Sequence, residues 1–201
     1  MFALIDDQQI TKFFSGNRGV TLGDVQYPKS IFSLWSEAER NAIGIYEVTV
    51  DTTNRKDEQW YINTNVSYGV ESNKAVGSYG TATAKAHADI LFTAQDEIDG
   101  LGTEGEVATR GLKYNLIQTV KRQAAGILQD TDWYIVRKAD AGTAVPSAIT
   151  THRAAVRTKA AEQETAITNA ADTPALETLY TYTTTDGVQS RPLGELPRLD
   201  S

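Results

Sequence analysis

The residues with the clearest chemical potential are glycines and carboxylates in residues 95–111. Residues 100–105 (Gly-Leu-Gly-Thr-Glu-Gly) match the G-x-G-x-x-G spacing of dinucleotide-binding loops. That motif needs a strand before it, a helix whose N-terminus faces the pyrophosphate, and then a parallel strand. Here Asp96, Glu97 and Glu104 would repel a phosphate, and the sequence that follows predicts two helices joined by a turn. We therefore expect no cofactor and predict an acidic, glycine-rich linker over residues 95–111.

Other catalytic and metal-binding patterns are also weak. The same carboxylates are ligands that a hard cation such as Ca²⁺ accepts, but they lack the spacing of an EF-hand. His87 and His152 have no acid or second histidine at metal-ligand spacing, and His152 is expected to pack on the inner edge of a helix. The chain has no cysteine, Walker loop or G-x-S-x-G elbow. We expect no metal and no enzyme; a small hydrolase or nucleotide-binding protein is the weakest of three functional hypotheses.

The charge distribution bears on partners. The 201 residues carry a formal net charge of −7: residues 1–110 carry −7, residues 111–171 carry +3, and residues 172–201 carry −3. An acidic chain disfavours nucleic acid, which needs clustered Lys and Arg. The basic helical segment and its acidic flanks attract one another, either within one subunit or between subunits. No apolar run reaches the length of a membrane span, and no secretion signal is visible.

Periodicity predicts an α+β chain whose residues 1–94 form a small antiparallel β-domain. A hairpin over residues 2–14 is followed by a loop over 15–23. Ser36 and Glu39 form a capping-box pattern, so a short helix should follow and end at Gly44. A strand over 45–50 precedes a second hairpin, made of residues 59–70 and 75–84. Residues 87–93 either begin a helix or end the sheet.

Residues 112–171 predict a helical hairpin region. Apolar side chains recur every four residues through the first helix, 112–129. Pro146 begins a second long helix that runs to about Ala170, with a thin, alanine-rich stripe that suits close helix contact or a trimeric seam. In residues 172–201 we expect a helical turn at Thr173-Pro174, a strand over 179–185, and an extended tail over 187–201 without a core of its own.

Between the two long helices lies the corner Thr131-Asp132-Trp133. Thr131 is expected to cap a short helix through Lys138, with Asp132 in its first turn and Gly142 ending it. Trp133 has two interpretations: a filler buried where two helices meet, or an anchor for a partner protein. A corner between short helices needs a large filler, so the first interpretation is preferred.

Two stretches resemble tail fibre assembly and tail-associated proteins of tailed bacteriophages. The stronger is the leucine-rich helix end, the Thr131-Asp132-Trp133 corner, and a following helix in which Arg153 and Arg157 match the arginines of a Tyr-Arg-x-x-(Leu/Val)-Arg pattern. His152 replaces the usual aromatic residue. The weaker stretch is the opening hairpin, the strand after Gly44, and Trp60 with its neighbour Tyr61. Together they cover about two thirds of the chain, and residues after Ala171 lie outside the match.

The resemblance implies a structural protein of the virion, associated with the tail in a fibre, tip or connector role. The alternative is a tail fibre assembly chaperone that is missing from the mature particle. Expected partners are other phage tail or fibre proteins and further copies of this chain, with a trimer as the symmetric form, because fibres usually are trimers. The expected location is the virion tail, after assembly in the host cytoplasm. The expected interaction residues are Thr131, Asp132, Trp133, Arg153, Arg157 and Trp60.

The preferred interpretation of Trp133 gives a testable expectation. If the indole is fully buried, Trp133→Ala should lower the free energy of unfolding of the helical part by about 3–5 kcal/mol. Chemical denaturation followed by circular dichroism measures that loss. Unchanged stability would favour the partner-anchor interpretation instead.

Overall fold

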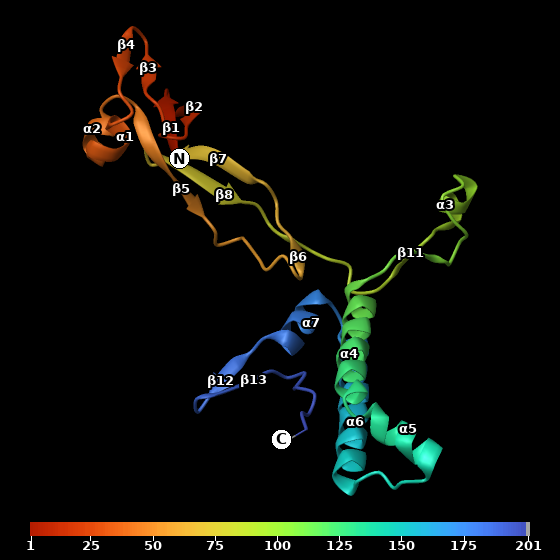
Figure 1. Cartoon of the computed structure of the whole chain (residues 1–201). Helices are drawn as coiled ribbons and strands as arrows, with labels where there is room; N and C mark the ends of the chain where they lie inside the picture. Colours follow the sequence, from red (N-terminus) through yellow and green to blue (C-terminus); the bar gives the residue numbers. More distant parts are fainter. Residues whose placement is uncertain (200–201) are drawn as a thin grey trace. The chain divides into compact units, whose positions relative to one another are not determined.

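The computed structural model describes residues 1–199 and shows an α+β chain (Figure 1), with 37% helix and 26% strand. The predicted fold class is therefore confirmed. The chain divides into two compact units, Met1–Thr83 and Ala84–Ser201. This division precedes the predicted boundary at residue 94. The segment after Ala84 belongs with the helices because the Ala86 and His87 carbonyls accept hydrogen bonds from Leu112 and Lys113 at the start of the first long helix.

The first unit is built on a five-stranded sheet. Its strand order is β2-β1-β5-β8-β7. The strands are β1 (Phe2–Asp6), β2 (Gln9–Phe14), β5 (Ile45–Asp51), β7 (Val66–Glu71) and β8 (Lys74–Tyr79). The two predicted hairpins are present as the antiparallel pairs β1–β2 and β7–β8. The central pair, β5–β8, is parallel, so the sheet is mixed rather than wholly antiparallel.

Both hairpins turn at residues that tolerate the left-handed backbone. Asp7 and Gln8 have φ of 47° and 62°, and Ser72 and Asn73 have φ of 50° and 58°. Two-residue turns with positive φ at both positions match the twist of the strands that they join. The polar residues at both turns thus adopt the backbone conformation that the two hairpins require.

A small apolar core holds this unit together. Phe14, Val20, Ile31 and Ile45 are buried and pack as one cluster. Ile31 begins α1 (Ile31–Leu34), which the sequence did not predict; α2 (Glu37–Asn41) follows with the predicted capping box of Ser36 and Glu39. Gly44, at φ +78°, ends this region as expected.

Residues 15–23, predicted as a loop, contain a strand of a small hairpin. β3 (Val20–Leu22) pairs with β4 (Val25–Tyr27) around Gly23, whose φ is +58°. The loop prediction is wrong because three-residue strands are too short for a periodic pattern. What fixes them is tertiary packing, since Val20 is buried in the core described above.

The predicted strand 59–70 is broken in two. A loop separates β6 (Tyr61–Ile62) from β7. In that loop, the side-chain amide of Asn63 forms hydrogen bonds with the backbone of Lys56. Its Nδ2 donates to the Lys56 carbonyl and its Oδ1 accepts from the Lys56 N–H, both at 2.8 Å. Asparagine side chains that bond backbone in this way compete with a sheet ladder. The predicted strand 75–84 divides likewise into β8 and β9 (Thr83–Ala84).

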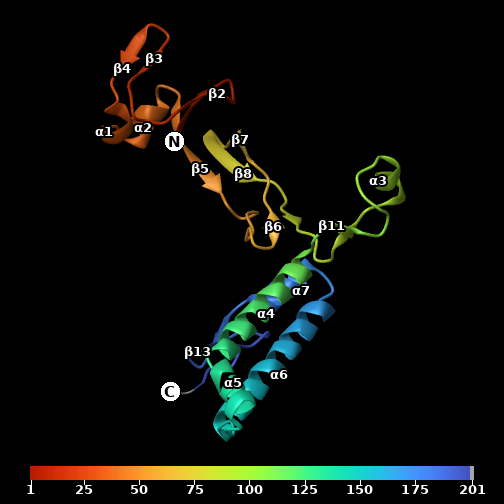
Figure 2. The ribbon, with the colours of Figure 1, turned by 45° about the vertical axis from the view of Figure 1, so that its right-hand side comes forward.

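The second unit is organised by two long helices, α4 (Leu112–Gln129) and α6 (Ser147–Asn169), which lie side by side (Figure 2). The predicted helical hairpin is confirmed. The whole predicted stripe of α6 is buried: Ile149, Val156, Ala160, Gln163 and Ile167. Small residues on that stripe let the two backbones approach closely. α5 (Asp132–Ala141) lies between them in the chain and ends at Gly142, whose φ of 69° suits a left-handed cap.

The C-terminal segment is more ordered than predicted. α7 (Thr173–Tyr180) is a full helix, so the predicted strand 179–185 is wrong at its start; only β12 (Thr183–Thr185) is strand, and it pairs with β13 (Val188–Ser190). The tail nevertheless packs on the rest of the unit at one point, because Leu193 is 3% exposed and its N–H donates to the Leu179 carbonyl. Residues 200–201 of that tail lie outside the described residues.

The predicted acidic linker is a folded projection. β10 (Ile90–Leu91) pairs antiparallel with β11 (Val107–Thr109), and α3 (Ala94–Ile98) lies between them. We call residues 89–110 the finger. The linker prediction is wrong because Thr93 and Asp96 form a capping box that starts a helix within the glycine-rich stretch.

The core of the first unit provides a stability test. Ile45 is 0% exposed, whereas Ile62 is 59% exposed. We expect Ile45→Ala to lower the free energy of unfolding by about 2–4 kcal/mol, because it removes apolar contacts and leaves a cavity. Ile62→Ala is the matched control and should change stability by less than about 0.5 kcal/mol. Urea denaturation curves that coincide for the two variants would contradict this core assignment.

Candidate functional site

The corner between α4 and α5 brings together three of the six predicted site residues, Thr131, Asp132 and Arg153. The backbone of Thr131 closes the end of α4 by donating its N–H to the Leu128 carbonyl at 3.1 Å. Its hydroxyl donates to the same carbonyl at 3.0 Å. Thr131 is 3% exposed, so this polar side chain is fully enclosed. The prediction that Thr131 caps α5 through its side chain is wrong, because the hydroxyl is directed back to α4.

Arg153 of α6 forms hydrogen bonds with this corner. Its Nη1 donates to the Leu128 carbonyl and to the Thr131 hydroxyl, each at 2.7 Å, and its Nη2 donates to Asp132 Oδ1 at 2.8 Å. The planar guanidinium suits this task because it presents several N–H donors in a fixed fork. One side chain thereby ties the end of α4 and the start of α5 to the N-terminal part of α6. We call Leu128, Thr131, Asp132 and Arg153 the arginine clamp.

The ion pair in the clamp is buried on one side only. The Arg153 side chain is 8% exposed, whereas that of Asp132 is 56% exposed. A buried guanidinium needs hydrogen-bond acceptors in place of water, and the clamp supplies three. Asp132 also lies in the first turn of α5, where a negative charge complements the helix dipole, as predicted.

Arg157, the second predicted arginine, has a lesser structural role. It is exposed, and its Nη1 approaches the Arg153 carbonyl one turn earlier at 3.5 Å. Two arginines of one sequence pattern therefore act differently, and burial rather than residue type decides between them. Neighbouring His152 is 8% exposed, in agreement with its predicted packing position.

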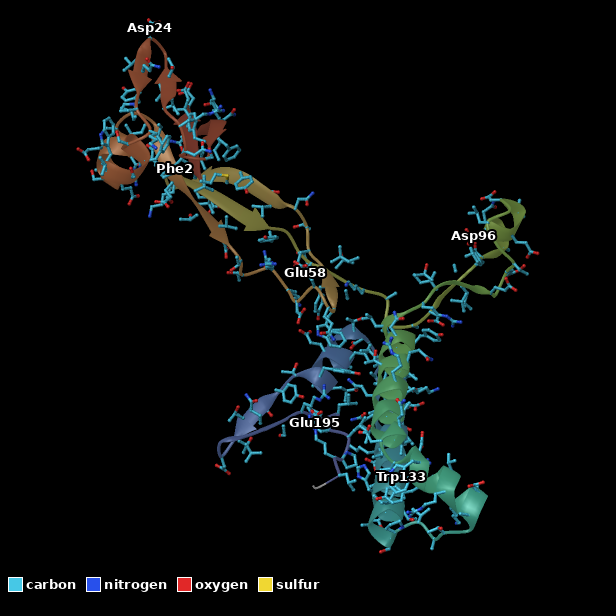
Figure 3. The ribbon with its side chains drawn as sticks, viewed as in Figure 1. Phe2, Asp24, Glu58, Asp96, Trp133 and Glu195 are labelled. Carbon is cyan, nitrogen blue, oxygen red and sulfur yellow. The ribbon has the colours of Figure 1, made fainter. Side chains whose placement is uncertain are left out.

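Trp133 lies outside the clamp. It is 51% exposed, so the prediction of a buried filler is wrong (Figure 3). Its ring contacts Tyr134 at 3.9 Å between centroids, and the Arg137 guanidinium lies 4.6 Å from the ring centre. Val136, one turn along the same face, is 65% exposed. We call Trp133, Val136 and Arg137 the α5 surface.

The rest of α5 is also poorly covered. None of its residues is buried, and Ile135, on another face, is 43% exposed. The corner is filled instead by the small and polar groups of the clamp. That arrangement removes the need for the large filler that the sequence suggested, and the Trp133 indole is half-exposed. By contrast Trp60, the remaining predicted site residue, is 3% exposed in the first unit.

The glycine motif does not have the surroundings of a nucleotide site. Residues 100–105 lie between α3 and β11, and no strand leads directly into them. Asp96 accepts hydrogen bonds from the backbone N–H and hydroxyl of Thr93, which hold the pKa of that carboxyl below its ordinary value. Within residues 1–199, no three or more His, Asp or Glu side chains gather closely enough to hold a metal ion.

The long helices and the C-terminal segment form a groove that was not predicted from the sequence. It has a volume of about 670 Å³, and its lining includes Arg122, Ile127, Arg191, Glu195, Leu196 and Arg198. Gln163 of α6 donates to the Gly194 carbonyl at 2.9 Å and so fixes the tail that forms one wall. The only signal in the sequence was the pair of arginines in a tail predicted to lack a core.

Glu195 organises the charges of that groove. Arg191 Nε lies 2.7 Å from its Oε1, and the Tyr182 hydroxyl donates to the same oxygen at 2.6 Å. Partial burial alone would raise the pKa of Glu195, but these contacts and the charges of Arg191 and Arg198 outweigh it and lower that pKa. The hydrogen bond to Glu195 in turn raises the pKa of Tyr182.

Comparison of the chain with protein-family models, with characterised proteins and with solved structures finds no match. Among the described helices, none combines the length and the apolar character that crossing a bilayer requires.

The arginine clamp gives a stability prediction. Arg153→Met keeps the aliphatic stem but leaves the Leu128 carbonyl and the Thr131 hydroxyl without their charged donor. We expect the free energy of unfolding to fall by about 2–3 kcal/mol. Arg157→Met, on the exposed side of the same helix, should change it by less than about 0.5 kcal/mol. Denaturation followed by helical circular dichroism compares the two, and equal values would show that the clamp contributes nothing.

Proposed function

We propose that the chain is a structural protein of a bacteriophage tail that acts by binding other proteins, with the α5 surface as one anchor. The observation that carries the proposal is an exposed indole on a helix that a buried arginine holds in place. Trp and Arg are over-represented among the residues that dominate binding energy at interfaces. A side chain whose backbone is already fixed loses less entropy on binding, so more of its contact energy appears as affinity.

The composition of the α5 surface supports a protein partner. Its apolar atoms are contributed by Trp133 and Val136, and Arg137 adds a charge directly beside the indole. Surfaces that bind proteins combine an apolar or aromatic centre with a polar rim. This small convex helix end has no enclosed volume for a small-molecule substrate, and no catalytic step is assigned to it.

The total exposed area also supports an interaction protein. The chain exposes 13250 Å². Surface scaling predicts about 9,300 Å² for a compact monomer of this mass, and about 11,000 Å² even if the two units are treated as separate compact bodies. This excess of exposed area is expected of a chain that buries more of its surface when it binds partners.

The resemblance to phage tail proteins adds the biological setting. Three of the residues that carry it, Thr131, Asp132 and Arg153, belong to one structural device, the clamp, whereas Trp133 and Arg157 lie outside it and are exposed. That device determines how α5 leaves the helix pair. A tail protein that joins fibre or tip components needs such a fixed projecting element, and we assign the virion tail as the location and tail or fibre proteins as partners.

The proposal predicts that purified particles of the encoding phage contain the chain at fixed stoichiometry, as measured by quantitative mass spectrometry. Trp133→Ala should leave the melting temperature within about 2 °C, because the indole is exposed, yet reduce the amount in particles at least about tenfold. Leu34→Ala, which trims a side chain that is 80% exposed in the first unit, is the matched control and should incorporate normally.

Two results would overturn this assignment. Absence from particles, together with rescue of an insoluble fibre subunit on co-expression, would establish the alternative, a transient assembly chaperone. Normal incorporation of Trp133→Ala would show that the α5 surface is not the anchor.

A further inference from the structure

The finger is a built element rather than a passive connection. At its base, Asp89 accepts hydrogen bonds from the Gly111 N–H at 2.8 Å and from Arg110 Nη1 at 2.6 Å. These two partners hold the pKa of Asp89 below its ordinary value, because both stabilise the carboxylate. The Leu112 and Lys113 N–H groups, which begin α4, donate to the Ala86 and His87 carbonyls at 3.0 Å. The first turn of α4 therefore holds the finger's base.

The outer part of the finger is held equally firmly. The Phe92 N–H donates to the Glu106 carbonyl at 2.9 Å, and the Gly105 N–H donates to the Phe92 carbonyl at 3.0 Å. The Phe92 ring covers Gly102 so closely that a Cβ there would lie 2.3 Å from a ring carbon, so only glycine fits. The glycines that resembled a nucleotide loop thus serve a tight fold at the tip.

This rigid tip buries little of its own surface. Ile98 is 77% exposed and Leu101 is 65% exposed. Around them the finger carries the acids Asp96, Glu97, Asp99, Glu104 and Glu106, and residues 90–109 contain no Lys or Arg. Two exposed aliphatic side chains among acidic residues indicate a contact surface. Its partner should carry basic side chains around an apolar patch.

The groove has those two properties. Its lining brings three arginines, Arg122, Arg191 and Arg198, against one acid, Glu195. Arg122 and Arg198 are exposed at its rim, and Ile127 and Leu196 supply apolar lining. Its charge is therefore opposite to that of the finger tip, with apolar groups between the charges on both surfaces.

We propose that the finger of one copy of this chain binds the groove of a second copy. Charge complementarity selects the partner: the acidic tip faces the arginine rim, while Ile98 and Leu101 enter against Ile127 and Leu196. A chain's own finger does not reach its groove. The finger is fixed at Leu112, whereas Arg122 lies about 15 Å further along α4, and Asp96 and Glu195 lie on opposite sides of that helix (Figure 3).

The contact joins two different surfaces, so it is heterologous. Such contacts repeat from subunit to subunit and either close into a ring or extend as a filament. This self-association is independent of the phage assignment, because it depends only on two surfaces of the second unit. It also differs from the α5 surface, which remains available to other proteins.

The test is the mass of the full chain in solution, measured by light scattering and sedimentation at several concentrations and salt levels. We expect association that weakens with salt, because exposed charges are screened. Asp99→Lys with Glu104→Lys reverses the finger, and Arg122→Glu with Arg198→Glu reverses the groove. Each double variant should weaken association about tenfold or more. Asp99→Lys also suits the end of α3, where a positive charge complements the helix dipole.

The decisive sample mixes the two double variants. Each alone should associate more weakly, by about tenfold or more. The mixture should associate again, because it pairs the unaltered finger of one variant with the unaltered groove of the other, and the basic finger with the acidic groove. Asp24→Lys with Arg18→Glu, two exposed reversals in the first unit, is the matched control and should associate like the original chain. Circular dichroism establishes that every variant is folded.

Three outcomes would overturn the proposal. They are a monomer at all concentrations, association that the reversals leave unchanged, and a mixture that stays monomeric although both double variants are folded. If a reversal prevents folding, Leu101→Ser replaces it, since that side chain is exposed and its loss should weaken association without lowering the melting temperature. Unchanged association of Leu101→Ser would then count against the finger.

Discussion

The hydrogen bonds of one buried guanidinium determine how the second unit is arranged. Arg153 donates to a helix-end carbonyl, a buried hydroxyl and a carboxylate, all between Leu128 and Asp132 where α4 ends and α5 begins. Removing an arginine head from water is costly, so the surrounding chain must place acceptors around it. Nη1 and Nη2 have such acceptors, although the buried Nε has no hydrogen-bond partner among the described residues. The direction of α5 is a consequence of that requirement. The exposure of Trp133 follows in turn, because the clamp already fills the corner.

The surfaces that we assign to binding share one design. The α5 surface and the finger tip both present apolar groups. Each belongs to an element that is held at its point of attachment by hydrogen bonds involving charged side chains. Neither element buries much surface, so neither gains its stability from a core of its own. Their rigidity comes instead from polar contacts at the point of attachment, and their outer faces stay free for partners. The groove is built in a similar way. One of its walls is the tail, which is held by hydrogen bonds from the Gln163 side chain and from the Leu193 N–H.

Much of the local structure could be predicted because it depends on neighbours in the sequence. The Ser36–Glu39 capping box, the left-handed Gly44 and Gly142, and the α6 stripe are all local patterns with one low-energy solution. The same logic failed in the finger. There the glycine spacing matched a nucleotide loop, although Gly102 lies against the Phe92 ring and Gly100 and Gly105 have positive φ. A spacing rule cannot distinguish these roles, because the ring comes from outside the motif.

Local sequence patterns were enough to predict the α+β class, both hairpins and the two long helices. These depend on periodicity, capping and turn chemistry, which act over a few residues. Only the tertiary structure decided what the corner residues do. Whether Thr131 caps α5 or accepts from Arg153, and whether Trp133 is buried or exposed, depends on a side chain 22 and 20 residues away in the chain. Burial is a property of packing between elements, and no local pattern contains it.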